Sequence, residues 1–437
     1  MYLQTGIILA IIVIAYALAK WKKLSVELSM LVAAVAGGLA GAVISNPPLG
    51  QLARHLVEGT FTYVDVILVF TTATIFMAVI SESGGVIYVV RGTIKYFYNR
   101  RIIALILLMI IVLIPGALTG AGSVSLLVVG APVALALGYL GIPKRKVAAI
   151  LFIVAGLSAA APPVNIWAMI LCAGTAIPYV GFELPLGIPV LLLGTFTVLV
   201  LGLKREKIMS LEEVLKEMPE VPARMKWWRV TVPFLVFIGL VVVYRIWPFT
   251  VPILGLPLEF VIAALAALLL STKKINILVL SRDTVKRLLP LLATIAVVGA
   301  LQQIMTATGV RGLLSYAVIS TPLIILFILL TIIIPVSEGV LTYGAAAIIG
   351  IPLIWFLDSL GLHATIVMAG LSLLWPLGDG LPPTALIGRL SVMVSEYKGS
   401  YWSFLLRTWI PWLAITIVAI LMIIFSARLE FLVRWSM

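Results

Sequence analysis

Four short stretches decide the fold that this sequence predicts. Residues 115–123 read PGALTGAGS and residues 335–344 read PVSEGVLTYG, while residues 158–165 read SAAAPPVN and residues 377–384 read LGDGLPPT. Each of them interrupts a long apolar stretch at a place where a straight membrane helix would normally continue. Non-helical backbone is tolerated at membrane depth only where protein or a water-filled site satisfies its polar groups. The four breaks therefore predict the position of a functional site.

The breaks form pairs that are 220 residues apart. Glycine and proline landmarks of the first half recur in the second half at this offset: Pro115/Pro335, Gly130/Gly350, Pro132/Pro352, Gly141/Gly361, Pro162/Pro382 and Pro163/Pro383. One gap-free offset for all of them indicates an internal repeat. We predict a first repeat over residues 1–203 and a second over 230–437, with a connecting segment between them.

The composition places the chain in a membrane. Of its 437 residues, 63% are hydrophobic and 11% are charged, whereas charged residues make up about 25% of soluble proteins. Because one spanning helix takes about 20 apolar residues, the chain has room for about a dozen membrane segments and for no soluble catalytic domain. We expect an all-α polytopic membrane protein with about ten spanning helices and two re-entrant hairpins. The hairpin tips are residues 115–123 and 335–344, two broken helices cover 147–178 and 365–395, and plain spans lie near 2–19, 25–46, 62–82, 186–203, 230–248, 258–271, 288–306 and 403–427.

The basic residues predict how the repeats are oriented, because cytoplasmic loops carry an excess of Lys and Arg. The loop after the first hairpin contains Lys144-Arg145-Lys146, whereas the equivalent residues 360–364 contain neither Lys nor Arg. The hairpins therefore enter from opposite faces, which makes the repeats inverted. This threading puts both termini outside and 25 of the 30 basic residues inside, the others being Arg54, Arg245, Arg311, Arg428 and Arg434.

Several segments connect the predicted spans. Residues 204–229 hold seven basic and five acidic residues, which predicts a cytoplasmic linker with a short amphipathic helix. The semi-polar segments 49–60, 86–99, 280–288 and 309–320 are either arms along the membrane interface or plain connecting loops. The first apolar run lacks a basic start and a cleavage site, so we expect a retained span and not a signal peptide.

The rest of the composition argues against other classes of function. The net charge of +13 is explained by topology, so we expect no nucleic-acid partner. The lone Cys172 cannot form an internal disulfide. His55 and His363 lie in predicted outer loops, too far from other ligands to predict a metal site. No P-loop is present, which argues against a nucleotide-driven pump, and we expect no enzymatic activity.

The chemistry of the breaks favours cation-coupled anion transport. Freed carbonyls and hydroxyls suit a hard cation such as sodium, and new helix N-termini suit an anion. The predicted ion-binding residues are Gly116, Thr119, Gly120, Ser158, Pro162, Glu338, Gly378 and Asp379. The predicted substrate-binding residues are Thr119, Ser123, Asn165, Thr342, Thr384 and Arg389.

Ionisable residues at membrane depth are costly and therefore indicate function. Glu338 lies in the second tip and Asp379 in the second break, and neither has a partner nearby in the sequence. Each is protonated, cation-bound or paired across the bundle. Arg389 either clamps a substrate carboxylate or snorkels to the cytoplasm.

At these residues the chain resembles the ion transporter superfamily and, within it, the large membrane subunit of TRAP transporters. The resemblance covers nearly the whole chain. It is carried by Gly116-Ala117-Leu118-Thr119-Gly120, by residues 156–166 with the first Pro-Pro, by Glu338 ahead of Pro352, and by the glycine-rich approach to Pro382-Pro383.

The resemblance implies an elevator mechanism, in which hairpins and broken helices form a mobile transport domain and the other spans form a scaffold. It implies sodium ions near each tip and break, organic acids such as dicarboxylates as substrates, and a place in the cell's inner (plasma) membrane. It also implies a small four-span membrane subunit and a soluble periplasmic or extracellular substrate-binding protein as partners. A homodimer is the remaining assembly that we considered.

Some residues depart from the TRAP pattern. Asp379 stands where large subunits are usually apolar, and Ala385-Leu386-Ile387 lacks the polar residue often found after the second Pro-Pro. An alternative is therefore a stand-alone symporter or cation/proton antiporter of the same superfamily, in which Asp379 carries the exchanged proton. A non-transporting membrane scaffold is a third possibility.

The inverted orientation can be tested by labelling. Cysteines introduced by Arg145→Cys and Ala364→Cys lie in the equivalent loops of the two repeats. In intact cells an impermeant thiol reagent should reach Ala364→Cys from outside, and Arg145→Cys only after the membrane is opened. Labelling of both from one face would end the inverted model.

Overall fold

The structure is a computed structural model that describes residues 2–45, 48–204, 211–247, 250, 252 and 254–436. Over these residues it is all-helical and contains no strand. Nine of the described helices are long and apolar enough to cross a membrane, or ten if one bent pair counts as a span. The prediction of an all-α, multi-pass membrane protein is therefore confirmed. The predicted linker is described only in part, because residues 205–210 lie outside the described ranges.

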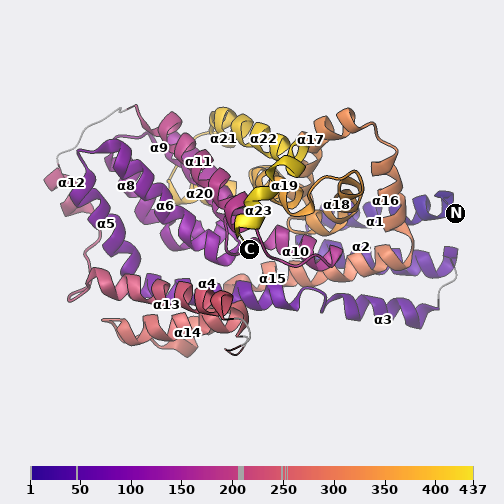
Figure 1. Ribbon diagram of the computed structural model, residues 1–437, viewed down its shortest axis with the longest axis horizontal. Coiled ribbons are helices and arrows are strands. Elements are labelled where there is room, and N and C mark those ends of the chain that lie inside the picture. The colour runs from indigo at the N-terminus through magenta and orange to yellow at the C-terminus, as the bar shows by residue number, and fades with distance from the viewer. Residues whose placement is uncertain are drawn as a thin grey trace.

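One group of helices packs around α15 (Ile277–Ala307), which runs along the length of the molecule (Figure 1). Both α2 (Val26–Ser45) and α4 (Val64–Glu82) pack on α15. The group is completed by α1 (Tyr2–Trp21) on α2, α14 (Gly255–Leu270) on α4, and α13 (Trp227–Ile246) on α14. α15 also packs closely on α3 (Leu49–Gly59), where Gly59 and Gly299 let the two backbones touch.

A second group surrounds α9 (Lys144–Ala160) and α19 (Ala364–Gly378). Residues 146–160 of α9 and 365–378 of α19 are all buried, as expected for helices that are apolar on every side. Their neighbours in the first half are α6 (Arg101–Thr119), α7 (Gly122–Ser125), the π-helix η1 (Leu126–Gly130), α8 (Ala131–Tyr139), α10 (Ile166–Thr175) and α11 (Glu183–Gly202). In the second half they are α17 (Leu323–Leu341), the π-helix η2 (Ala346–Gly350), α18 (Ile351–Ser359), α20 (Leu386–Val394), α21 (Tyr401–Arg407), α22 (Trp409–Ile424), η3 (Ser426–Leu429) and α23 (Glu430–Ser436).

The semi-polar segments of the sequence are helical and not plain loops. They form α3, α5 (Gly85–Phe97) and α16 (Val310–Ile319), and the described part of the linker contains α12 (Leu211–Glu217). Both α5 and α16 follow a glycine with positive φ, 86° at Gly84 and 77° at Gly309. This conformation carries little cost for glycine and lets the chain turn sharply before each helix.

Two predicted spans differ from the observed helices. The span near 288–306 is the second part of α15, which starts at Ile277 because Asn276 caps it by accepting a hydrogen bond from the Val279 amide at 3.2 Å. The span near 403–427 bends by 53° between α21 and α22. Pro411 lies in the first turn of α22 and has no N–H to continue the hydrogen-bond ladder of α21.

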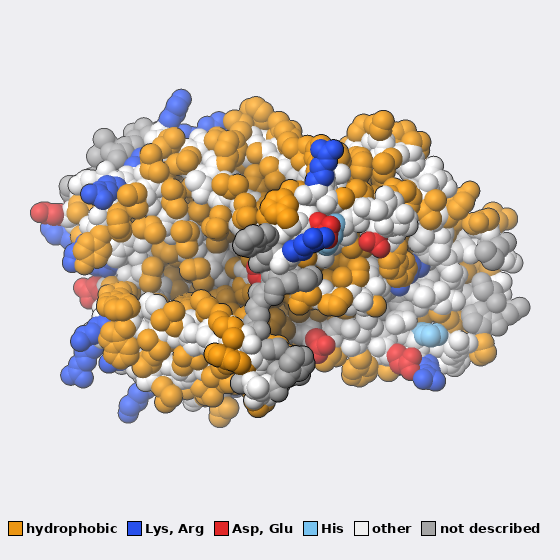
Figure 2. All heavy atoms as spheres, in the orientation of Figure 1, with side chains coloured by type: hydrophobic (Ala, Val, Ile, Leu, Met, Phe, Trp, Pro, Cys, Tyr) orange, Lys and Arg blue, Asp and Glu red, His pale blue; other side chains and the backbone are white. Residues whose placement is uncertain are grey.

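The surface matches a protein whose middle faces lipid. In Figure 2 hydrophobic side chains cover much of the face shown, Lys and Arg gather at the end that carries α5, α8 and α12, and a smaller group of charged side chains lies near α23. At the start of α9, Lys144 pairs with Glu396 at 2.8 Å, and Arg145 donates to the Ser403 hydroxyl at 3.3 Å. These contacts join the first half of the chain to the second at the surface.

The contact between α3 and α15 generates a stability prediction. A Cβ on Gly59 would lie 2.5 Å from the Ala300 Cα and 2.7 Å from the Gly299 carbonyl oxygen. Gly59→Ala should therefore force the helices apart and lower the free energy of unfolding by about 1–3 kcal/mol. Thermal unfolding in detergent would measure the loss.

The matched control for this prediction is Gly138→Ala in α8, where no atom lies within 4 Å of the added carbon. This variant should be as stable as the wild type or slightly more stable, because alanine is the better helix former. Equal unfolding temperatures for the two variants would contradict the packing account.

Candidate functional site

In the first half, the hairpin tip packs on the helix break. α6 ends at Thr119 and α7 begins at Gly122, while α9 ends at Ala160 before Pro162 and Pro163. The Val164 amide in the break donates to the Ala117 carbonyl oxygen at 3.0 Å. Gly116 lies against Ser158 with no room for a Cβ.

The second half repeats this arrangement. The Thr384 amide donates to the Gly339 carbonyl oxygen at 3.2 Å, and the Thr384 hydroxyl donates to the same oxygen at 2.9 Å. A Cβ on Gly378 would overlap the Pro335 carbonyl oxygen and lie 2.7 Å from the Glu338 Cβ. Each tip is thus held to its own break by a backbone hydrogen bond and a glycine contact.

Side chains donate hydrogen bonds to carbonyl oxygens within the two breaks. The Tyr179 hydroxyl donates to Pro163 at 3.1 Å, and the Tyr401 hydroxyl donates to Gly380 at 2.7 Å. Arg389 donates to the Pro383 carbonyl oxygen at 3.0 Å. The exposed Arg389 is therefore bound to the break itself, at the start of α20.

Asn165 closes the first break. Its side-chain oxygen accepts from the Ala168 amide at 2.9 Å, and its side-chain nitrogen donates to the Ala160 carbonyl oxygen at 3.0 Å. The same side chain therefore caps the start of α10 and provides a donor for the last carbonyl oxygen of α9. Its backbone amide donates to the Tyr179 hydroxyl at 3.0 Å.

A small cavity lies where the elements of the two halves meet. Ser123 comes from the first tip, Glu338 and Thr342 from the second tip, and Asp379 from the second break. Its volume of about 10 Å³ is close to the minimum that one water molecule needs. The other lining residues are Gly122, Leu291, Tyr343, Leu386 and Ile387.

The two carboxyl groups of this cavity have no basic partner among the described residues. The side chains are 1% exposed at Glu338 and 6% exposed at Asp379. One carboxyl oxygen of Glu338 has no hydrogen-bond partner in the described part of the chain, and the same holds for the buried Trp167 indole N–H. An unpaired buried charge is costly, so of the three alternatives for these acids, a bound proton or a bound cation is favoured over an ion pair.

Most predicted residues of the first half do not line this cavity. The Thr119 hydroxyl donates to Pro115 at 2.7 Å and the Ser158 hydroxyl to Ala155 at 2.6 Å, so both donor hydrogens are used within their own helices. The predicted residues that lie outside the cavity are Gly116, Thr119, Gly120, Ser158, Pro162, Asn165, Gly378, Thr384 and Arg389. Ser123, Glu338, Thr342 and Asp379 are the predicted residues that the structure brings together.

Sequence reasoning missed several residues near the site. Tyr343 lies within the quoted second tip and Leu291 lies far from any break, yet both line the cavity. The offset of 222 between Tyr179 and Tyr401 was a signal that could have identified the two hydroxyl donors.

Glu259 in α14 is also buried, at 4% exposure, and one of its carboxyl oxygens has no partner among the described residues.

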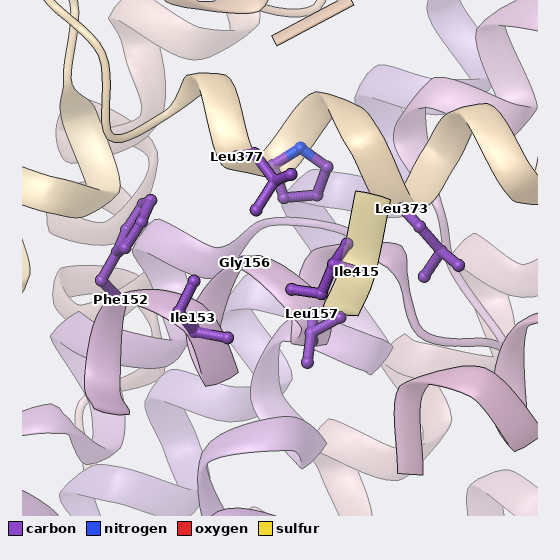
Figure 3. A pocket seen from close by; sticks show the side chains of 8 residues that line it. Phe152, Ile153, Gly156, Leu157, Leu373, Leu377 and Ile415 are labelled. Atoms are coloured by element: carbon purple, nitrogen blue, oxygen red, sulfur yellow. The ribbon is translucent and has the colours of Figure 1, made fainter. Parts of the chain in front are cut away.

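The crossing of α9 and α19 is apolar and contains no candidate site. Figure 3 shows Phe152, Ile153 and Leu157 on one side of a small cavity and Leu373 and Leu377 on the other. The cavity lining is entirely apolar. This crossing therefore packs the two central helices together and leaves the polar chemistry to the tips and breaks.

Comparison with known proteins adds no family. No protein-family model matches the chain, and no curated protein matches it significantly. The fold and the site alone define the class, which is a multi-pass all-α membrane protein with buried carboxyl groups beside its helix breaks.

The double role of Asn165 generates a prediction. Asn165→Ala leaves a buried amide and a buried carbonyl without partners, which should lower the free energy of unfolding by about 1–3 kcal/mol. Asn276→Ala removes an exposed cap from α15, where water can replace the lost hydrogen bond. It should therefore lower the free energy of unfolding by less than Asn165→Ala does. Thermal unfolding of both variants checks this, and a larger loss for Asn276→Ala would show that Asn165 does not hold the break.

Proposed function

We propose that the chain is an ion-coupled secondary transporter of an organic anion such as a carboxylate. The single observation that carries the proposal is the small cavity in which Ser123, Glu338, Thr342 and Asp379 meet. It joins both halves of the chain at membrane depth. Ionisable groups placed in this way mark ion and substrate pathways.

The cavity suits the coupling ion. Two carboxyl groups and two hydroxyls provide oxygen atoms only, which is the ligand set of a hard monovalent cation or of a shared proton. The space is sufficient for one desolvated ion and too small for an organic acid. Sodium or a proton is therefore the coupling ion in this proposal.

The helix N-termini beside the breaks suit the anion. α10 begins at Ile166 and α20 at Leu386, each directly after a Pro-Pro break. The first amides of a helix and its dipole attract negative charge. A cation bound between Glu338 and Asp379 would neutralise the acids beside α20 and allow the anion to approach, which couples the two ligands.

The inverted repeats and the elevator mechanism belong to this proposal, and the observed elements support them. η1 and α8 recur as η2 and α18 at an offset of 220, and α5 and α16 each follow a left-handed glycine. The two groups of helices would then be the scaffold around α15 and the transport domain around α9 and α19. On this basis we place the protein in the inner (plasma) membrane and relate it to TRAP large subunits.

A stand-alone symporter or cation/proton antiporter of the same superfamily is the second candidate. The observation in its favour is that Asp379, absent from the TRAP pattern, shares one small cavity with Glu338. Two acids so close can share a proton, as proton exchange requires. In the first candidate a four-span subunit and a substrate-binding protein would be needed, and in the second they would not.

The proposal is tested by uptake into proteoliposomes that contain only this chain. A panel of labelled organic acids is offered with an inward sodium gradient or an inward proton gradient, imposed separately. Gradient-dependent uptake of an acid is expected for a self-sufficient symporter and identifies the ion. If no acid is taken up, cation-driven proton flux is expected for the antiporter, and uptake restored by partner proteins is expected for the TRAP-like system.

The residues of the cavity generate a prediction for the same assay. Glu338→Gln and Asp379→Asn keep the size of each side chain but remove its charge, so each should reduce gradient-driven flux by about tenfold or more, as expected if about 1.4 kcal/mol of cation binding is lost. Glu259→Gln is the matched control, because Glu259 is a buried acid that does not line the cavity. Wild-type flux in Glu338→Gln and Asp379→Asn would remove the cavity from the mechanism.

A further inference from the structure

A second and much larger cavity lies beside the small one. Its volume is about 420 Å³, and we call it the vestibule. It separates α4 and the first part of α15 from the hairpin helix that follows the first tip. Its lining residues are Thr74, Ala78, Ser81 and Glu82 from α4, Val124, Leu127 and Val128 from the hairpin, and Lys274, Ile275, Asn276, Val279, Leu280, Asp283, Thr284, Arg287 and Leu288 at α15.

The vestibule leads toward the buried carboxyl groups. Its α15 residues recur at helical spacing from Asn276 to Leu288, a distance of about 18 Å along the axis. Leu291, less than one turn further, already lines the small cavity. On the hairpin side Ser123 lines the small cavity and Val124 lines the vestibule. One helical turn of α15 and the first tip therefore separate the two spaces.

The vestibule is lined by two acidic and two basic side chains, which lie at different depths. Asp283 is paired with Arg282 at 3.3 Å, and Glu82 lies at the end of α4, near the mouth. Lys274 precedes α15 at the mouth, whereas Arg287 lies about 6 Å along the helix from Leu291. Neither Lys274 nor Arg287 has a hydrogen-bond or ion-pair partner among the described residues. The deepest charged group is thus an unpaired guanidinium.

The vestibule does not continue to the other end of α15, because its lining on this helix stops at Leu288. Gly59 and Gly299 are in backbone contact there, and the buried Tyr63 hydroxyl donates to Gln302. A Cβ on Gly344, the last residue of the second tip, would lie 3.1 Å from the Val298 side chain. The vestibule therefore lies beside the part of α15 near which Lys273, Lys274, Arg282, Lys286 and Arg287 gather.

We infer that the vestibule contains a binding site for a small organic anion, in which Arg287 holds a carboxylate and Lys274 attracts it at the mouth. A guanidinium binds a carboxylate through two parallel hydrogen bonds. The lining also contains two acids, but Glu82 lies at the end of α4 and Asp283 is paired with Arg282, so Arg287 is the charged group nearest the inner end. An anion that enters beside the basic residues at the start of α15 would reach this site before it reaches the small cavity. The inference rests on the proposed function, because it concerns the same substrate class.

The test measures binding without transport. Cys172 is the protein's lone cysteine, so Cys172→Ala with Ser81→Cys places a single thiol on the wall of the vestibule, opposite α15. The rate at which a methanethiosulfonate reagent modifies this thiol is measured from the basic face. The measurement is repeated with mono- and dicarboxylates of two to six carbons. At least one acid should protect the thiol severalfold when Arg287 is present.

Charge variants identify the residues that hold the anion. Arg287→Gln should abolish the protection, Lys274→Gln should weaken it, and Arg287→Lys should restore part of it. Lys286→Gln is the matched control, because Lys286 is exposed, as Arg287 is, but does not line the vestibule. Arg287→Gln should also lower the rate ratio of an anionic to a cationic reagent, with a smaller effect at high salt.

The outcomes separate this inference from the proposed function. No protection by any acid, or equal protection in Arg287→Gln, would overturn the vestibule site even if gradient-driven uptake is observed. An equal loss in Lys286→Gln would also overturn it, because the effect would then be that of general surface charge. Protection that requires Arg287, in a protein that moves no acid and no cation, would support the site while the proposed function fails.

Discussion

The architecture depends on one constraint, which is that polar backbone groups freed by a helix break inside a membrane must find partners. Here each break is paired with the hairpin tip of its own half, through Val164 with Ala117 and through Thr384 with Gly339. Glycines allow this close approach, and tyrosine hydroxyls donate to one carbonyl oxygen in each break, that of Pro163 and that of Gly380. The breaks are therefore fixed structural features, against which ionisable side chains can be positioned.

This arrangement has chemical consequences. The chain itself satisfies backbone groups of the breaks. The acids Glu338 and Asp379 have no basic partner among the described residues, and they are buried where a bare charge is costly. A cation or a proton removes that cost, which is the physical basis for coupling. The vestibule beside α15 adds an open path with an unpaired Arg287 along it. In the proposed mechanism Arg287 would bind the anion on this path, and the acids of the small cavity would bind the cation.

The sequence predicts the class of fold well and the site only in part. Long apolar runs predict spanning helices because few other structures bury them, and paired prolines end α9 at an identifiable position. The neighbourhood of Ser123 and Glu338 could not be predicted, since it depends on how the two halves dock. Thr119 and Ser158 show another limit, because sequence cannot distinguish a free hydroxyl from one that bonds its own helix. The start of α15 was missed because one face of its first turns is polar.

The most direct measurement of the central claim is cation binding to the purified protein. A ligand that binds only the folded state raises the unfolding temperature, so unfolding is followed during titration with sodium chloride, with choline chloride as the control, at several pH values. Sodium or protons should stabilise the wild type, and the double variant Glu338→Gln/Asp379→Asn should not respond. A response in the double variant equal to that of the wild type would contradict the account.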